Sequence, residues 1–406
     1  MKPHILINMH YLEIGGTETA LIGLLNALDP ERVDVDLFLH DHRGEMMQFI
    51  PKWVNVLPAV PEYTVLERPI KELVKRGFWL IAGARLWAKY ISKKAYKKSH
   101  SSLPNAGIFH YIAKYTTPLL PKINPTVTYD LAISFLNPHQ TTTQKVNAQK
   151  RIAWIHTDYT KIWVDADDEL PIWSKYDYIA SISPDVTKTF LQTFPSFAHT
   201  NKIVEIENIL SPAFVRRRAD IKNVEGEMSK YGGEVKLLSI GRFCEAKNYD
   251  NVPDICQRMV KEGVDVKWFI IGYGDEQLIR RKIEEAGMQE HVIILGKRSN
   301  PYPYIKACDI YVQPSRYEGK SVTVREAQML CKPVVVTNYP TASSQIKSGV
   351  DGVIVPMDNE GCVKGLVKVI MDKVLQTRLV DYLKTHDYGN EREVDKIYQI
   401  AEEAQR

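Results

Sequence analysis

The sequence predicts an α/β protein of two doubly wound domains. Its 406 residues exceed what one hydrophobic core usually organises. Both halves alternate short, almost continuously apolar runs with segments of helical spacing, a pattern typical of parallel sheets covered by helices on both faces. We expect Rossmann-like domains over residues 1–212 and 213–386, and a polar helix over 387–406 that returns to the first domain.

The first domain is expected to begin with a buried strand over 4–10. A turn at Gly15 and Gly16 follows, and then a helix over 17–28 that has Thr17 available as its N-cap. Four further apolar runs have the character of strands, and the third of them precedes a helix over 184–194: 130–135, 151–157, 178–183 and 202–208.

The second half shows the alternation most clearly. Residues 210–223 lose the apolar periodicity and are expected to form the linker between the domains. Six apolar runs follow as predicted strands: 234–241, 266–272, 291–296, 310–315, 333–337 and 352–356. Helical segments fall in the intervals between them, including 249–264, 276–288 and 301–309.

The composition excludes several classes of protein. With 44% hydrophobic residues and a net charge of +4, it is that of an ordinary globular protein. No apolar stretch reaches the roughly 18 residues of a membrane span, and the start lacks the pattern of a signal peptide. Five cysteines without a Cys-x-x-Cys pair indicate free thiols in a reducing compartment, so we expect a cytoplasmic protein without disulfides or a zinc site.

Two loops carry residues suited to a phosphorylated ligand. Gly15 and Gly16 would let a phosphate approach the backbone at a helix start, although a simple tight turn is the alternative. The fingerprint Gly-x-Gly-x-x-Gly is absent there, which disfavours a nicotinamide cofactor. Arg242 and Lys247 stand at the carboxyl end of a predicted strand, where their cations could grip a diphosphate, with a solvated loop as the alternative.

A third loop places two acidic residues, Glu318 and Glu326, eight positions apart. A single helix would rotate them about 80° from each other, which gives no shared face. Gly319 and Ser321 instead predict that Glu318 lies in the loop and that Ser321 lies near the start of a helix, whose N–H groups favour a phosphate. Glu318 could then reach sugar hydroxyls and Glu326 a ribose, but a solvated helix face explains the bare spacing equally well.

The order of these motifs resembles glycosyltransferase family 4. The resemblance is carried by 239–248, 269–276, 293–340 and 352–356, and in the first half by 15–21 and 153–158. It implies a GT-B fold, in which two Rossmann-like domains face each other across a cleft, and a retaining, sugar-nucleotide-dependent transferase. The sequence of residues 317–328 is most similar to that of bacterial enzymes that build capsular or exopolysaccharide repeat units.

Residue by residue, the resemblance assigns Arg242 and Lys247 to the donor diphosphate, Glu318 to the transferred sugar and Glu326 to the nucleotide ribose. His156 matches a cleft histidine that bonds the donor sugar or the acceptor; a satisfied core histidine is its alternative. The other expected donor contacts are Gly15, Gly16, Lys297, Arg298, Gly319, Ser321, Val322 and Thr323.

Some positions depart from the pattern of this family. Ser321 stands where many members have proline, and Pro340, Thr341 and Gln345 stand where relatives often carry Gly-Gly and Glu. The sugar specificity is therefore left open, while the diphosphate-binding residues are unaffected.

The resemblance implies transfer of a hexose or N-acetylhexosamine from a nucleoside-diphosphate sugar, with UDP as the expected nucleotide. The expected acceptor is a lipid-linked glycan intermediate of bacterial surface polysaccharide synthesis. The alternatives are a non-hydrolysing UDP-sugar epimerase of the same shape and a non-catalytic sugar-nucleotide-binding protein. No cofactor or metal is expected, because the cations can stabilise the leaving diphosphate; Asp165 and Asp167 form an Asp-x-Asp pattern but fall in a polar loop.

A strongly basic segment, expected at about 62–122, interrupts the first domain. It holds 12 lysines or arginines and 3 acidic residues. Within it, 85–100 interleaves aromatic residues with six basic residues and no acid, which favours an anionic membrane surface as the partner of 68–98. A solvated basic helix is the alternative, and no nucleic-acid-binding motif accompanies the charge. We therefore expect peripheral attachment to the inner face of the cell membrane.

Overall fold

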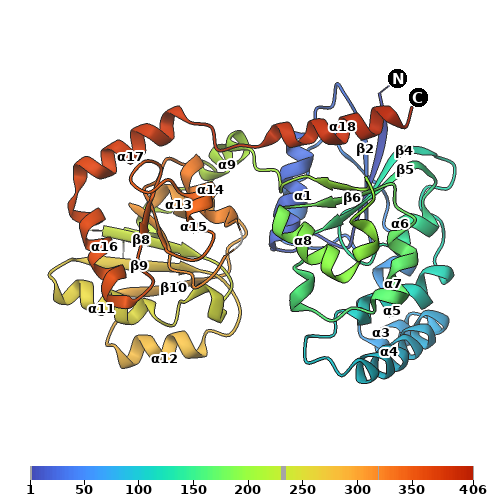
Figure 1. Cartoon of the computed structure of the whole chain (residues 1–406), viewed down its shortest axis with the longest axis horizontal. Helices are drawn as coiled ribbons and strands as arrows, with labels where there is room; N and C mark the ends of the chain where they lie inside the picture. Colours follow the sequence, from blue (N-terminus) through green and yellow to red (C-terminus); the bar gives the residue numbers. More distant parts are fainter. Residues whose placement is uncertain (1, 230–234, 319, 406) are drawn as a thin grey trace. The chain divides into compact units, whose positions relative to one another are not determined.

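The structure is a computed structural model that describes residues 2–229, 235–318 and 320–405. The chain forms two compact units (Figure 1). The first unit comprises Met1–Ile209 together with Asn390–Arg406, and the second comprises Leu210–Gly389. The C-terminal segment thus belongs to the first unit.

Within the described residues, the first unit is built on a seven-stranded parallel sheet of order β3-β2-β1-β4-β5-β6-β7. The strands are β1 (His4–Met9), β2 (Asp34–Leu39), β3 (Asn55–Val56), β4 (Tyr129–Ser134), β5 (Ala148–Ile155), β6 (Tyr178–Ser181) and β7 (Ile203–Glu205). The main helices around it are α1 (Gly16–Ala27), α6 (Gln140–Lys145), α7 (Ala166–Trp173), α8 (Pro184–Thr193) and α18 (Val394–Glu403).

The basic segment forms a helical insert between β3 and β4. Its helices are α2 (Pro61–Thr64), α3 (Ile70–Lys75), α4 (Trp79–Ser99) and α5 (Gly107–Thr116). Its inner side belongs to the core of the unit, since Tyr63, Leu73 and Ile81 are buried in one cluster with Leu6 and Phe38 of the sheet. Each such fully buried side chain contributes about 1.5–3 kcal/mol, so the insert is an integral part of the fold.

The described part of the second unit holds a six-stranded parallel sheet of order β10-β9-β8-β11-β12-β13. Its strands are β8 (Val235–Ile240), β9 (Val266–Ile271), β10 (Val292–Gly296), β11 (Ile310–Gln313), β12 (Val334–Thr337) and β13 (Val353–Val355). Its helices are α9 (Pro212–Ala219), α10 (Glu225–Ser229), α11 (Val252–Lys261), α12 (Gln277–Glu285), α13 (Tyr302–Ala307), α14 (Val322–Met329), α15 (Ala342–Gln345), α16 (Asn359–Met371) and α17 (Lys373–Thr385).

In both sheets the order of the strands reverses beside the first strand. β1 lies between β2 and β4, and β8 lies between β9 and β11. In doubly wound sheets, ligands bind beyond the carboxyl ends of the strands at such a reversal. The loops that follow β1, β4, β8 and β11 are therefore the positions at which to look for a site.

Two sequence-based expectations about local structure are wrong. Helix α1 begins at Gly16 with Gly15 as its N-cap, so Thr17 lies inside the helix. Residues 210–223 contain the helix α9, which buries Phe214, Val215 and Arg218 against the second unit. The arginine run concealed this helix, because a buried arginine does not contribute to an apolar pattern.

The cysteines and the longest helix complete the picture of the fold. The five cysteines, all of them described, are free thiols. No helix within the described residues combines the length and the apolar character that crossing a bilayer requires. The longest, α4, places charged side chains along its second half.

Candidate functional site

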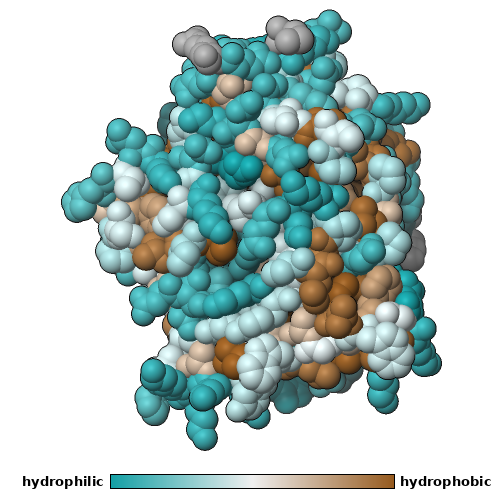
Figure 2. Space-filling model, turned by 90° about the vertical axis from the view of Figure 1, so that its right-hand side faces the viewer, coloured by the Kyte–Doolittle hydropathy of each residue, from teal (hydrophilic) through white to brown (hydrophobic). Residues whose placement is uncertain are grey.

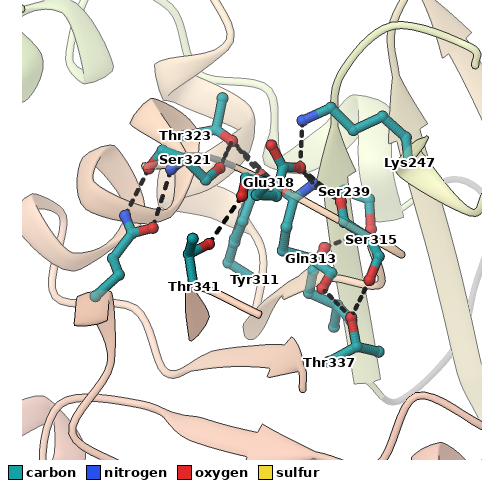
Figure 3. A network of polar contacts seen from close by, with 12 residues as sticks. Ser239, Lys247, Tyr311, Gln313, Ser315, Glu318, Ser321, Thr323, Thr337 and Thr341 are labelled. Atoms are coloured by element: carbon teal, nitrogen blue, oxygen red, sulfur yellow. Dashed lines mark hydrogen bonds and ion pairs between the residues drawn. The ribbon is translucent and has the colours of Figure 1, made fainter. Parts of the chain in front are cut away.

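Lys247 and Glu318 form the centre of a polar network at the carboxyl edge of the second sheet (Figure 3). Nζ of Lys247 lies 2.5 Å from Oε1 of Glu318, and the two side chains are 19% and 12% exposed. Lys247 ends a short 3₁₀ helix after β8, and Glu318 follows the adjacent strand β11. Gly241 makes room for the lysine, since a Cβ there would lie 2.9 Å from Lys247 Cε.

Buried groups at the carboxyl end of β11 and just beyond it hold the Glu318 carboxylate in place (Figure 3). Ser315 Oγ lies 2.6 Å and Gln313 Nε2 lies 3.0 Å from Oε1 of Glu318. The Tyr311 hydroxyl lies 2.8 Å from Gln313 Oε1 and 2.7 Å from Thr323 Oγ1. Because Gln313 and Ser315 are completely buried, the orientation of the carboxylate is set before any ligand arrives.

Two contacts tie the loop after β8 to the loop after β11. Arg316 forms a bidentate pair with Asp250, with distances of 2.9 Å (Nη1–Oδ1) and 2.8 Å (Nη2–Oδ2). Asn248 takes a left-handed conformation with φ of 60° and donates from Nδ2 to the Pro314 carbonyl at 2.9 Å. Paired planar groups of this kind fix geometry as well as adding energy.

Helix α14 begins beside this network, with Ser321 as its N-cap. The side-chain amide of Gln345 bonds both backbone groups of Ser321: the N–H donates to Oε1 at 2.9 Å, and the carbonyl accepts from Nε2 at 2.7 Å. Thr341 Oγ1 donates to the Glu318 carbonyl at 2.8 Å. Thr341 and Gln345 are two of the positions at which the chain departs from the family pattern, and both shape this turn.

The sequence predicts that a phosphate meets the start of α14. In this structure the Ser321 N–H is not open to a phosphate, because it donates to Gln345. Val322 and Thr323 follow as the first helical residues, at the positive end of the helix dipole. Gly319 lies outside the described residues.

Glu326 is buried on the inner side of α14 and is 3% exposed. Tyr302 donates to its Oε1 at 2.8 Å. Burial raises the pKa of Glu326 to about 7, although the Tyr302 hydrogen bond and the Arg218 charge act in the opposite direction. Glu326, the residue expected to bind the ribose, is thus held by contacts of its own, distinct from the Lys247–Glu318 pair.

The remaining predicted cations lie on loops at the same edge of the sheet. Arg242 follows β8 and is exposed. Lys297 and Arg298 follow β10; Nζ of Lys297 lies 5.4 Å from the centre of the Tyr273 ring, and Nε of Arg298 donates to the Tyr304 hydroxyl at 2.9 Å. Lys247 is therefore the predicted cation that the structure places within the network.

In the first unit, His156 follows the last residue of β5. Its Nε2 lies 3.0 Å from the Phe135 carbonyl, so this nitrogen carries the hydrogen and Nδ1 is left as an acceptor. Burial lowers the pKa of His156 to about 4, which keeps the ring neutral at neutral pH. Gly16 has open space around it, since a Cβ there would meet no atom within 4 Å, whereas one on Gly15 would meet the Glu18 carboxylate at 2.3 Å.

The apolar pattern did not reveal a row of histidines at this edge of the first sheet. His10 directly follows β1, His40 directly follows β2, and His139 lies beyond β4, beside the strand that precedes His156. His10 and His40 stack with ring centres 4.8 Å apart, and Nδ1 of His10 lies 2.7 Å from Glu67. Burial lowers the pKa of His40, and that of His139 to about 3. The sequence carried little signal for this row, because His10 falls inside the predicted strand 4–10 and the strand before His40 was not predicted.

The Asp-x-Asp pattern has a structural role in the fold. Asp165 is the N-cap of α7, accepting the N–H of Asp168 at 3.3 Å, and it also accepts the Tyr111 hydroxyl at 2.6 Å. The described residues contain no group of three or more His, Cys, Asp or Glu placed to hold a metal ion.

The second unit matches a known family. Residues 220–386 match the family model described as "Glycosyl transferases group 1", and this range lies within Leu210–Gly389 and covers most of it. The second unit therefore carries a glycosyltransferase group 1 domain.

One curated relative is the N-acetylgalactosamine-N,N'-diacetylbacillosaminyl-diphospho-undecaprenol 4-alpha-N-acetylgalactosaminyltransferase of Campylobacter jejuni. The chain is 29% identical to it over 154 residues, which is 37% of this chain and 41% of the relative. The chain thus spans less than half the length of this relative.

Solved structures match over the whole chain. A glycosyltransferase from Rickettsia africae has a TM-score of 0.64 at 15% identity and covers 100% of this chain and 99% of its own. Anabaena HepE, solved with UDP and glucose, has a TM-score of 0.61 at 12% identity and covers 99% of this chain and 98% of its own. These likenesses, with the two parallel sheets, confirm the predicted α/β fold of GT-B type.

Proposed function

We propose that this protein is a retaining glycosyltransferase. In this proposal it moves a hexose or N-acetylhexosamine from a nucleoside-diphosphate sugar, with UDP as the expected nucleotide, to a lipid-linked glycan intermediate of surface polysaccharide synthesis. The observation that carries the proposal is the Lys247–Glu318 pair, held by buried Ser315 and Gln313 at the carboxyl edge of the sheet.

Three findings support the substrate classes. The second unit carries a glycosyltransferase group 1 domain. The printed name of the Campylobacter relative includes a diphospho-undecaprenol acceptor, and Anabaena HepE was solved with UDP and glucose. A carboxylate with fixed orientation suits sugar hydroxyls, and a lysine with the start of α14 beside it suits a diphosphate.

In the proposed reaction, the bond between the anomeric carbon and the diphosphate breaks, and a bond to the acceptor oxygen forms on the same face. The acceptor proton goes to an oxygen of the leaving diphosphate. Lys247, together with Arg242 from the same loop after β8, would stabilise the charge that develops on this group. Because these cations can neutralise the diphosphate, we propose that no metal is required; turnover that persists in excess EDTA is the expected result.

Glu318 is proposed to position the sugar, and it is not assigned the role of a nucleophile. Its Oε1 accepts from Lys247, Ser315 and Gln313 at 2.5–3.0 Å. Hydrogen bonds to the charged form stabilise a carboxylate and so reduce its tendency to attack carbon. In the first unit, Nδ1 of His156 is proposed to accept a hydrogen bond from a hydroxyl group of the sugar or the acceptor.

The test is incubation of the purified chain with a panel of nucleotide sugars, with and without a bacterial lipid extract, read by mass spectrometry. The expected result is release of UDP that depends on the extract, together with a lipid product one sugar heavier. Conversion of one UDP-sugar into another without the extract would replace the proposal by an epimerase. Binding of nucleotide sugar without turnover under every condition would reduce it to a binding protein.

A further inference from the structure

Helix α4 has one side fixed to the first unit. Its buried residues include Ile81, Ala82 and Ala88. Arg85 is buried too, and its Nη1 donates to the carbonyls of Val65 at 3.1 Å and Arg68 at 2.6 Å. Because these contacts repeat at helical spacing, the opposite face of α4 must point away from the unit.

That outward face is apolar over the first half of the helix. Five large side chains there are more than half exposed: Trp79 (65%), Leu80 (76%), Leu86 (55%), Trp87 (53%) and Tyr90 (58%). Phe109 of α5, the helix that packs along α4, is 55% exposed as well. Figure 2 looks onto the side of the molecule on which α4 and α5 lie, and apolar surface appears there between polar side chains. Such a grouping of exposed apolar side chains is unusual for a soluble surface and marks an interaction site.

The second half of the same face is basic. Lys89, Lys93, Lys94, Lys97 and Lys98 are all exposed, and α4 contains no acidic residue. In the described part of the chain, none of these five lysines forms a salt bridge. The helix therefore presents an apolar end and a cationic end in sequence along one face, with no internal charge compensation.

We propose that α4 and Phe109 form a docking surface for an anionic phospholipid bilayer. Aromatic and leucine side chains suit the boundary between head groups and acyl chains, and lysines suit lipid phosphates. The lysines would suit a nucleic acid, but the exposed Leu80 and Leu86 would not. The lysines would also suit an acidic protein, but such a partner does not explain Trp79 and Trp87, which suit the boundary between head groups and acyl chains. Charge complementarity together with the apolar end therefore favours the bilayer.

This inference extends the proposed function, because a lipid-linked acceptor is met at such a surface. Its test does not depend on glycosyl transfer. The full chain is sedimented with phosphatidylcholine vesicles that contain or lack phosphatidylglycerol, at low and high salt. We expect binding to the anionic vesicles that weakens as salt rises, since screening reduces attraction between exposed charges.

Two variants separate the two halves of the surface. A lysine near an anionic surface is worth roughly fivefold in affinity, so Lys93→Gln/Lys94→Gln/Lys97→Gln should weaken vesicle binding on the order of 100-fold. Leu80→Ser/Trp87→Ser should also weaken vesicle binding, and the residual binding should keep the salt dependence of the unaltered chain. The matched control removes the same charge from exposed lysines of the second unit: Lys261→Gln/Lys368→Gln/Lys373→Gln, which should bind like the unaltered chain.

Different results would contradict the docking surface, the choice of partner and the proposed function. Absence of sedimentation at low salt, or equal loss in the α4 variant and in the control, would overturn the docking surface. Binding to RNA that exceeds binding to anionic vesicles would overturn the choice of partner. The triple α4 variant should retain turnover with a detergent-solubilised acceptor, so a failed glycosyltransferase assay with intact vesicle binding would count against the proposed function alone.

Discussion

Replacing Lys247 by alanine removes the charged member of the groups that bond Glu318 Oε1. Ser315 and Gln313 remain at 2.6 and 3.0 Å, so the carboxylate keeps two neutral donors. The loss of one hydrogen bond to a charged, largely buried group costs about 1–3 kcal/mol. For a unit of this size, that corresponds to a fall in Tm of about 2–12 °C, and the fold should survive.

The effect on turnover should be larger than the effect on stability. Loss of one preorganised group that stabilises developing charge typically costs about 10²–10³-fold in kcat. The assay is UDP release with the lipid extract, measured beside thermal unfolding of the same preparation. Lys306→Ala is the matched control, because Lys306 also lies 2.5 Å from a carboxylate, that of Asp220, but both side chains are more than half exposed. Its stability should change by less than about 1 kcal/mol.

Two results would contradict a role of Lys247 in stabilising the leaving group. If Lys247→Ala turns over within about twofold of the unaltered chain while Lys306→Ala does the same, Lys247 does not act on the leaving group. If turnover falls only in proportion to the fraction of unfolded protein, its role is structural. Either result would move the catalytic cation elsewhere on this edge of the sheet, with exposed Arg242 as the next residue to replace.

Three other replacements probe the remaining parts of the site. Burial raises the pKa of Glu326 from 4.5 to about 7, so the folded state retains a proton that the unfolded state releases between these values. The free energy of unfolding should therefore fall as pH rises through this window, by about 3 kcal/mol at most. In Glu326→Gln, the free energy of unfolding measured by urea should depend less steeply on pH. Since burial lowers the pKa of His156 to about 4, kcat/KM should show no titration of this ring between about pH 5.5 and 8, while His156→Ala should lower turnover at every pH; a limb near pH 6.5 that disappears in the variant would contradict this. Gly16→Ala meets no atom within 4 Å, so Tm should stay within about 2 °C while the KM for the donor rises; an unchanged KM would show that no phosphate approaches this turn.

The alternation of strands and helices was predictable because most strands are apolar on both faces. Strand β2 escaped notice because acidic residues interrupt it. Asp36 in this strand is 4% exposed, and it is satisfied by the Tyr129 hydroxyl at 2.6 Å and by Asn55 Nδ2 at 2.7 Å. A buried polar side chain with partners distant in the chain costs little in the fold, but it breaks the pattern in the sequence.

The loops that carry the site residues could be predicted from the sequence, but the contacts between their side chains could not. Lys247 and Glu318 could be assigned to the ends of two strands, but their separation of 2.5 Å depends on β8 and β11 being neighbours. The clamp of Gln345 on Ser321 joins positions 24 residues apart. Such contacts arise from tertiary packing, which no local spacing encodes.

Both ends of the chain bond one carboxylate oxygen. Asp130 Oδ2 accepts the backbone N–H of His4 at 2.7 Å and the side-chain amide of Gln405 at 3.1 Å. The final helix also reaches the beginning of the chain through the Tyr398 hydroxyl, which accepts the N–H of Asp29 at 2.8 Å. The unit that carries the Lys247–Glu318 network is thus an insertion within the other unit, continuous from Leu210 to Gly389.

A chain with adjacent ends can be closed into a circle and opened elsewhere, and exposed loops are the places where such rearrangements are tolerated. Joining the two ends through a short peptide and cutting near 210 and 389 would turn each unit into an uninterrupted polypeptide. The two halves could then be made separately and mixed, so that recovery of transfer would report on their association.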